Sequence, residues 1–155
     1  MTLLNSKKPK QGDKKMNTII KILNGFSGIG HWLPRASLAA TFLYHGFPKF
    51  MMAKGMADMM GMPVIAVYML AMMEVGGAVL LLWGGFGPDW ATRIGGLLMA
   101  APMVGAIGMV HAQNGWNSVN MGPDMPGKGM EFQVLILAIA LFFAVKGNSA
   151  NKANV

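Results

Sequence analysis

Apolar residues gather in four long segments, at about residues 33–52, 63–83, 92–112 and 130–145. A helix needs about 20 apolar residues to cross a bilayer core of about 30 Å, and the first three segments approach that length. The fourth is shorter, so we expect it to begin slightly earlier or to cross a thinned region of the bilayer. The pattern predicts an all-α fold, a transmembrane four-helix bundle over residues 32–147.

Glycine and proline mark the boundaries between these segments. The stretch GGFGPD at 84–89 separates the second segment from the third, and NGWNSVNMGPDMPGKG at 114–129 separates the third from the fourth. Pro63 falls where a first-turn proline is tolerated, whereas Pro102 lies inside the third segment. We therefore expect Pro63 to begin a helix and Pro102 to kink one.

A short apolar stretch precedes the first span. Residues 16–31 contain Ile19, Ile20, Ile22, Leu23 and Phe26, interrupted by Lys21. This segment is too short and too interrupted to cross a membrane, so it is expected to form an amphipathic helix on the membrane surface. A cleavable signal peptide fits poorly because of Lys21 and the long apolar run that follows. Residues 1–15 are expected to form a basic cytoplasmic tail, and residues 148–155 a second tail.

The composition is typical of a membrane protein. Hydrophobic residues make up 54% of the 155 residues and charged residues only 12%, with 21 glycines and 17 methionines. The length fits a single domain. The chain has no cysteine, which excludes disulfides, thiol catalysis and cysteine-ligated metals.

The net charge of +7 is concentrated beside the apolar segments, which indicates membrane topology and not a nucleic-acid site. With four spans, ten of the 13 Lys and Arg, Arg35 among them, fall on the side of the two termini. Only Lys49, Lys54 and Lys128 fall on the other side. The positive-inside rule then predicts a multi-pass protein of a bacterial-type inner (plasma) membrane, with both termini cytoplasmic.

Glu74 lies in the middle of an apolar segment. It follows Pro63 by about 11 residues, which at 1.5 Å per residue places it about 16 Å deep, near the midplane of the bilayer. A carboxylate facing lipid there costs about 3 kcal/mol or more. We therefore expect Glu74 to face the interior of the bundle, toward imidazoles of neighbouring helices, and to be paired or protonated.

Other polar residues gather toward the same outer half of the bundle. His45 and Lys49 lie four residues apart on the first helix, His111 ends the third, and Glu131 begins the fourth. The candidate catalytic residues are Glu74, His45, His111 and Glu131, and the candidate cofactor-binding residues are Tyr44, Lys49, Tyr68 and Gly77. No metal site is assigned. Small residues predict close helix approach; they are Gly76, Gly77, Gly95, Gly96, Ala101, Gly105, Gly108 and Ala112. For the glycines after Glu74, room for a planar ligand is the alternative.

Several stretches in order resemble a known family. They are RASLAATFLYHGFPKF (35–50), EVGGAVLLLWG (74–84), the Arg93 entry to the third span, and His111 followed by MEFQVLILAIALFFAVKG (130–147). Over about residues 33–147 the chain resembles the DoxX family of small four-helix membrane proteins. That family includes subunits of thiosulfate:quinone oxidoreductase and members linked to quinone handling or oxidative stress, while many members have no established activity. The polar positions that match are Arg35, His45, Lys49, Glu74, Arg93, His111 and Glu131.

A quinone site is consistent with these residues. A quinone needs an apolar slot and one or two hydrogen-bonding groups at its oxygens, which His45 and His111 would supply, while Glu74 or Glu131 would move a proton. No haem, flavin or iron–sulfur motif is present in the sequence, so electrons must come from a bound quinone or a partner subunit. The hypothesis is a quinone-associated or accessory subunit of a membrane redox complex, incomplete as an enzyme alone. Its expected partners are the lipid bilayer and other membrane protein subunits, with no nucleic acid.

Two alternatives remain open at this stage. The buried polar residues can simply hydrogen-bond one another, which would make the chain a structural subunit without its own site. Methionine provides the other alternative, because thioethers bind Cu(I) and His45 or His111 would complete a copper site. Methionine also packs flexibly against partners. The methionines concerned are Met51, Met52, Met56, Met59, Met60 and Met62 in one outer loop and Met121, Met125 and Met130 in the other.

Overall fold

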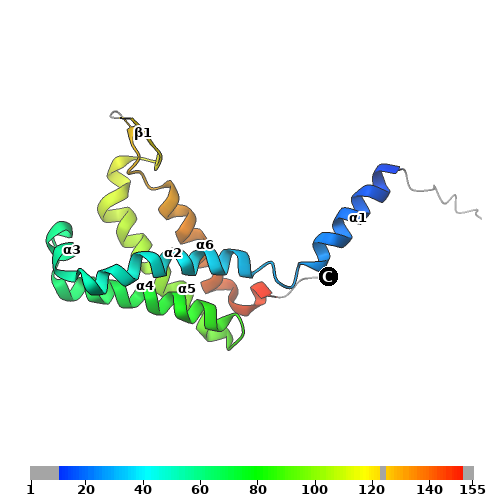
Figure 1. The fold of residues 1–155 in the computed structure, drawn as a ribbon, viewed down its shortest axis with the longest axis horizontal. Coiled ribbons are helices and arrows are strands. Elements are labelled where there is room, and N and C mark those ends of the chain that lie inside the picture. Colours follow the sequence, from blue (N-terminus) through cyan, green and yellow to red (C-terminus); the bar gives the residue numbers. More distant parts are fainter. Residues whose placement is uncertain (1–10, 123–124, 152–155) are drawn as a thin grey trace, which may run out of the picture.

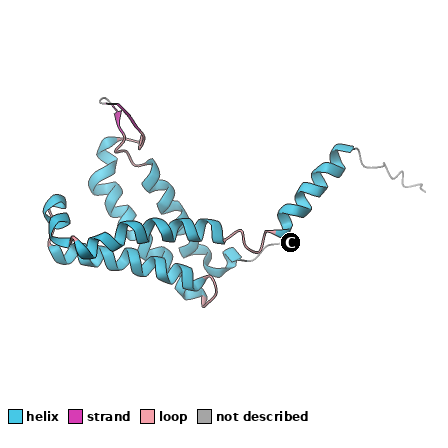
Figure 2. Ribbon diagram, in the orientation of Figure 1, coloured by secondary structure: helices cyan, strands magenta, loops and turns pink. Residues whose placement is uncertain are grey.

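The fold is helical, as predicted (Figure 2). The computed structural model describes residues 11–122 and 125–151. Its α-helices are α1 (Gln11–Gly25), α2 (Trp32–Met51), α3 (Ala53–Met60), α4 (Val64–Gly84), α5 (Asp89–Ala106) and α6 (Glu131–Lys146). Residues 1–10 of the predicted basic tail and residues 152–155 of the second tail lie outside the described part of the chain.

The long helices form two pairs. Helix α2 packs against α4, α4 against α5, and α5 against α6, while α2 and α6 touch only slightly. In Figure 1 the α2/α4 pair and the α5/α6 pair cross and then diverge, so that α3 and the β1/β2 hairpin stand apart at the open end. The polar residues of the candidate site lie toward this open end.

Three helical segments are long and apolar enough to cross a membrane: Val64–Gly84, Asp89–Asn114 and Glu131–Asn151. The fourth segment reaches 21 residues because a 3₁₀ turn at Gly147–Asn151 extends its end, and not through an earlier start. Helix α2 has a comparable length of 20 residues. It carries Arg35, His45 and Lys49 and is less apolar, so the four-span topology stays a prediction.

Large apolar side chains cover the outer faces of these helices. A water-soluble bundle would bury most of them, whereas acyl chains cover such faces in a membrane. Exposed examples are Ile65, Met72 and Val79 on α4, Leu97 and Val104 on α5, and Leu135 and Phe142 on α6. These faces, together with the apolar helices, mark the chain as a membrane protein.

Glycine sets the closest helix contacts. A Cβ on Gly95 of α5 would lie 2.8 Å from the carbonyl oxygen of Gly77 on α4, and a Cβ on Gly96 would lie 2.6 Å from the carbonyl oxygen of Ala140 on α6. The prediction of close approach is thus confirmed at these glycines. It is wrong for Gly76, Gly105 and Gly108, where an added Cβ would meet nothing within 4 Å.

Several small elements have no clear signal in the sequence. The methionine-rich loop contains helix α3, which ends at Gly61 in the left-handed conformation, with φ 63°. A minimal antiparallel hairpin pairs β1 (Asn120–Gly122) with β2 (Met125–Pro126). After α5 the chain continues as a π-helix (Ile107–His111) and a 3₁₀ turn (Ala112–Asn114). The α-helix continues through Pro102 and changes to a π-helix only at Ile107. Such π-helical segments often occur at functional sites.

Helix α1 begins at Gln11, ahead of the predicted boundary at residue 16. It projects away from the four long helices (Figure 1). Its large apolar side chains Ile19, Ile20, Ile22 and Leu23 are all exposed, by 45% or more. An uncovered apolar face on a basic helix is what the interfacial interpretation requires. The location of α1 in a membrane interface stays a prediction.

Candidate functional site

Glu74 points into the bundle and pairs with a lysine. Its residue exposure is 4%, and Lys49 Nζ on α2 lies 2.6 Å from its Oε2. Lys49 also donates to the backbone carbonyl of His45, at 2.8 Å. The inward orientation is therefore confirmed. The direct partner is an ammonium group, not an imidazole.

Gly46 allows this pair to form. It lies on the face of α2 that meets α4, and a Cβ there would be 2.8 Å from Val75 Cγ2 and 3.1 Å from Glu74 Cβ. Lys49 follows Gly46 by three residues, so the two positions share one face of α2. The missing side chain at Gly46 brings the helices close enough for Lys49 to reach Glu74.

A cavity of about 450 Å³ lies among α2, α4, α5 and α6. We call it the four-helix cavity; its lining residues are Thr41, Phe42, His45, Glu74, Met103, Ala106, His111, Phe132, Gln133 and Ile136. Its volume falls within the range of about 300–1,000 Å³ that is usual for small-molecule sites. Apolar walls combined with a few polar groups are also typical of such sites. The predicted convergence of His45, Glu74 and His111 is therefore present.

Glu131 lies in an adjoining cavity. This second cavity, of about 550 Å³, sits beneath the hairpin and shares His111, Phe132 and Gln133 with the first. Glu131 Oε1 accepts a hydrogen bond from the Ser118 backbone N–H at 3.1 Å. Its carboxylate thus ties the loop before the hairpin to the first turn of α6, beside the four-helix cavity and not within it.

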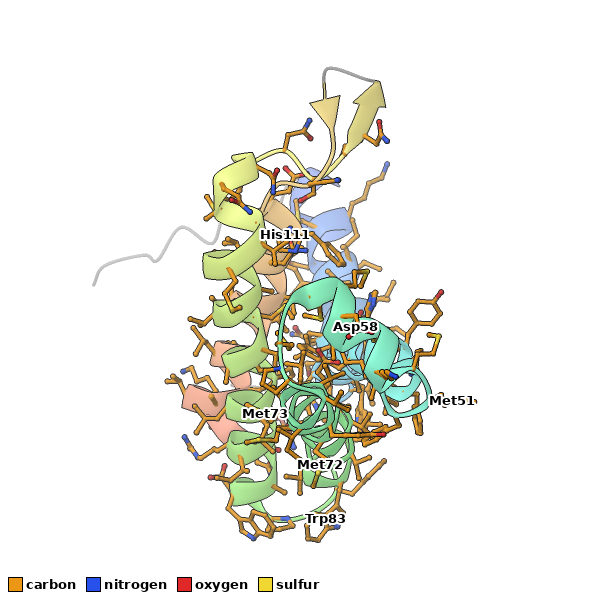
Figure 3. The ribbon with its side chains drawn as sticks, turned by 90° about the vertical axis from the view of Figure 1, so that its left-hand side faces the viewer. Met51, Asp58, Met72, Met73, Trp83 and His111 are labelled. Carbon is orange, nitrogen blue, oxygen red and sulfur yellow. The ribbon has the colours of Figure 1, made fainter. Side chains whose placement is uncertain are left out.

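A backbone hydrogen bond fixes the tautomer of His111. Figure 3 shows His111 at the end of the α5 segment nearest the hairpin. Its Nδ1 lies 2.8 Å from the carbonyl oxygen of Lys128. Because a carbonyl only accepts hydrogen bonds, a neutral His111 must carry its proton on Nδ1, and Nε2 keeps a lone pair. Nε2 has no hydrogen-bond partner among the described residues.

Three of the predicted cofactor-binding residues lie elsewhere. Tyr44 is 78% exposed and Tyr68 is 39% exposed, and neither lines the four-helix cavity. Gly77 faces α5, where an added Cβ would lie 2.9 Å from Met99 Cγ and 3.1 Å from Leu98 Cβ. The space beside Gly77 is filled by α5, so the expectation of room for a planar ligand there is wrong.

The comparisons with known proteins support one family. The DoxX family model matches residues 30–112, which is more than half of the chain. The chain belongs to the DoxX family. It is also similar to the protein named "Putative oxidoreductase CatD" from Bacillus subtilis (strain 168), with 31% identity over 123 residues, covering 77% of this chain and 81% of that protein. No solved structure matches.

The DoxX match covers the elements that carry most of the site. Residues 30–112 include α2, α4 and α5 with the π-helix, and therefore His45, Lys49, Glu74 and His111. Helix α6, which supplies Gln133 to the cavity, lies beyond the match. The family match therefore includes the three helices α2, α4 and α5 that line the cavity together with α6.

Arg35 has a structural role inside the bundle that the charge pattern did not predict. It was counted as a topology signal, yet it is 0% exposed in this DoxX chain. Its guanidinium donates to the carbonyl of Leu81, to Thr92 Oγ1 at 3.1 Å and to Asn151 Oδ1 at 3.2 Å. It also lies over the ring of Phe143, at 4.7 Å from the centroid. Arg35 therefore joins α2 to α4, α5, α6 and the C-terminal 3₁₀ turn.

His31 and Arg93 complete the polar contacts at this closed end. Burial, followed by the Arg35 charge, lowers the pKa of the His31 imidazole, which favours its neutral form. Arg93 Nε lies 2.5 Å from Asp89 Oδ2, and its Nη1 donates to the Val145 carbonyl at 2.6 Å. The family resemblance marked Arg35 and Arg93, but no pattern in the sequence pointed to Thr92 or Asn151 as contacts of Arg35.

The methionine-rich loop packs on the bundle. Met56 and Met62 lie against the buried residues Ala53, Ala57 and Val67, whereas Met59 is 77% exposed. The side chains of Met121 and Met125 lie outside what the structure describes. Across residues 11–122 and 125–151, no group of three or more His, Cys, Asp or Glu side chains is placed to hold a metal ion. Packing accounts for Met56 and Met62, and copper binding stays untested.

Proposed function

We propose that this DoxX protein is a membrane subunit that binds a quinone in the four-helix cavity. The observation that carries the proposal is the cavity itself, where His45, Glu74 and His111 meet apolar walls from α2, α5 and α6. A quinone requires this combination, because its ring is apolar and its two oxygens form hydrogen bonds. The name of the Bacillus subtilis relative, an oxidoreductase, is consistent with the proposal.

The lining residues fit a quinone by their chemistry. Phe42, Met103 and Ile136 would contact the ring. The imidazole of His45 would bind an oxygen of the ligand, and His111 Nε2 would accept a hydrogen bond from a hydroxyl group of its reduced form. Gln133 adds a buried carboxamide oxygen without a partner in the described part of the chain. An unpaired buried acceptor costs free energy, which a bound hydrogen-bond donor would recover. When bound, the quinone would supply the electron-carrying group that the sequence otherwise lacks.

Glu74 and Lys49 would handle protons at the cavity wall. Lys49 holds one carboxylate oxygen at 2.6 Å, which fixes the orientation of the Glu74 side chain. The other oxygen remains available for a proton from the cavity. His111 Nε2 is a second acceptor, and the Lys128 carbonyl stabilises the ring when it becomes protonated.

A second subunit completes the proposed function. Because the sequence has no haem, flavin or iron–sulfur motif, electrons would pass between the quinone and a partner protein in the same membrane. We place the chain in the plasma membrane with both termini in the cytoplasm. Helix α1 would then rest on the cytoplasmic surface, where its lysines face anionic lipids.

Quinone retained through purification tests this function. The protein would be purified from bacterial membranes in mild detergent and its extracted quinone quantified per chain. We expect retained quinone in the wild type and its loss in Glu74→Gln and His111→Ala. Tyr44→Phe is the matched control, because Tyr44 is next to His45 but points away from the cavity. A wild type without quinone, or equal quinone in all four proteins, would contradict the proposal.

The structural alternative gives a different result in the same experiment. Lys49 and Glu74 satisfy each other without a ligand, so a bundle with no site of its own is consistent with this pair. In that case a membrane complex would co-purify with the chain while no quinone is found. The substitutions would then change stability without changing any bound small molecule.

A further inference from the structure

We infer that the four-helix cavity is built for the hydroxyl-bearing, reduced form of its ligand, a quinol, in preference to the quinone. This inference rests on the proposed function and adds which form the site recognises. It follows from the hydrogen-bonding capacity of the groups that line the cavity.

The two forms of the ligand differ in what they offer. A quinone has two carbonyl oxygens, which only accept hydrogen bonds, whereas a quinol has two hydroxyl groups, which also donate. A cavity lined by free donors therefore selects the quinone. A cavity lined by free acceptors selects the quinol, because only the quinol satisfies them.

His111 presents an acceptor. Its Nδ1 is committed to the Lys128 carbonyl at 2.8 Å, so the neutral ring can offer only the Nε2 lone pair to a ligand. Lys128 belongs to the loop just before α6, and the acceptor is fixed by backbone geometry. A quinone carbonyl placed against this nitrogen would set two lone pairs against each other.

Glu74 presents a second acceptor, and Gln133 presents an acceptor together with a donor. The carboxamide oxygen of Gln133 is buried and has no donor among the described residues. Lys49 occupies Oε2 of Glu74, and Oε1 accepts no hydrogen bond from the described residues. Both side chains line the four-helix cavity together with His111.

The donors of Thr41 and Lys49 are already used, whereas the Gln133 carboxamide offers N–H groups as well as its oxygen. Thr41 Oγ1 donates to the Ser37 carbonyl at 2.9 Å. Lys49 Nζ is engaged with Glu74 and with the His45 carbonyl. His45 is the lining imidazole whose tautomer no described contact fixes, so it can serve a hydroxyl oxygen of the ligand as donor. The fixed acceptors, His111 Nε2 and Glu74 Oε1, match two hydroxyl groups better than two carbonyls. His45 and Gln133 can serve either form of the ligand.

Binding of a matched redox pair tests the inference. The probes are duroquinol, kept reduced under anaerobic conditions, and duroquinone, titrated by calorimetry into the full chain in lipid nanodiscs. We expect duroquinol to bind about tenfold more tightly, which corresponds to one hydrogen bond. His111→Phe should weaken binding of duroquinol and leave binding of duroquinone nearly unchanged. Gln133→Met should weaken both, while Tyr44→Phe should preserve the ratio.

A change in the ligand avoids any dependence on how the variants fold. The dimethyl ether of duroquinol keeps the ring but cannot donate, so it should lose the advantage of the quinol with the wild-type protein. Equal affinity for duroquinol and duroquinone, or tighter binding of duroquinone, would overturn the inference and leave the proposed function intact. Binding of neither probe would overturn both.

Discussion

Gly46 on α2 faces Glu74 on α4 with no room for a methyl group between them. A Cβ at position 46 would lie 3.1 Å from Glu74 Cβ and 3.3 Å from its Oε2. Gly46→Ala should therefore push the two helices apart and lower the free energy of unfolding by about 1–3 kcal/mol, as overpacking does in other cores. Thermal unfolding followed by circular dichroism in detergent measures the change.

Gly76→Ala is the control for that substitution. Gly76 lies on α4 near Glu74, but an added Cβ would meet nothing within 4 Å. Alanine has the higher helix propensity, so this variant should be as stable as the wild type or slightly more stable. An equal loss of stability in Gly46→Ala and Gly76→Ala would contradict the inference that Gly46 is needed for the close approach of α2 and α4.

The Lys49–Glu74 pair should behave as a coupled unit. Both side chains are largely buried, with 12% and 6% exposure, so Lys49→Met alone leaves Glu74 without its counter-ion. That variant should lose about 3 kcal/mol of stability. Adding Glu74→Gln should recover much of the loss, because the double variant has no uncompensated charge. A double-mutant cycle measures the coupling, and strictly additive losses would contradict the pairing.

Replacing Arg35 should lower the free energy of unfolding more than replacing the other arginine, Arg93. Arg35→Met removes the hydrogen bonds to Leu81, Thr92 and Asn151 and should cost about 3 kcal/mol. Arg93→Met is the matched control; its side chain is 42% exposed, so about 1 kcal/mol or less is expected. Denaturant titration of both variants checks the order, and a larger loss at Arg93 would contradict it.

The sequence predicted the long helices well because the membrane imposes strict rules. Every backbone polar group in a bilayer must be satisfied within a helix, so apolar length alone locates α2, α4 and α6 closely. Helix α5 ends at Ala106, before the predicted end at about residue 112, because the chain continues as a π-helix and a 3₁₀ turn. The same reasoning correctly turned Glu74 inward. The C-terminal extension of α6 was not predicted, because the Gly147–Asn151 turn that lengthens it consists of polar and small residues without an apolar pattern.

The candidate site was only partly predictable. Helical depth brought His45, Glu74 and His111 together, yet the choice of Lys49 as the partner of Glu74 depends on the close approach at Gly46. Tyr44 and Tyr68 were assigned by depth, but depth does not say which face of a helix they occupy. Arg35 was misjudged because Thr92 and Asn151, which hold it inside, are distant in the chain.

Single cysteines test the predicted topology cleanly, because the natural chain has none. Met59→Cys on α3 and Val119→Cys beside the hairpin are exposed positions at the open end. They should react with a membrane-impermeant maleimide in intact cells. Asn24→Cys on α1 should react only after the inner membrane is opened, because the positive-inside rule places α1 in the cytoplasm. Labelling of Asn24→Cys in intact cells would contradict this orientation.

Photo-crosslinking of an azidoquinone to the full chain in nanodiscs tests the quinone site most directly. Peptide mapping by mass spectrometry should locate the label on the lining segments around Phe42, Met103 and Phe132. Unlabelled quinone should compete for these positions, and His45→Ala should lose the labelling. Label confined to the lipid-facing residues of α4 and α6, unaffected by competitor, would contradict a quinone site in the four-helix cavity.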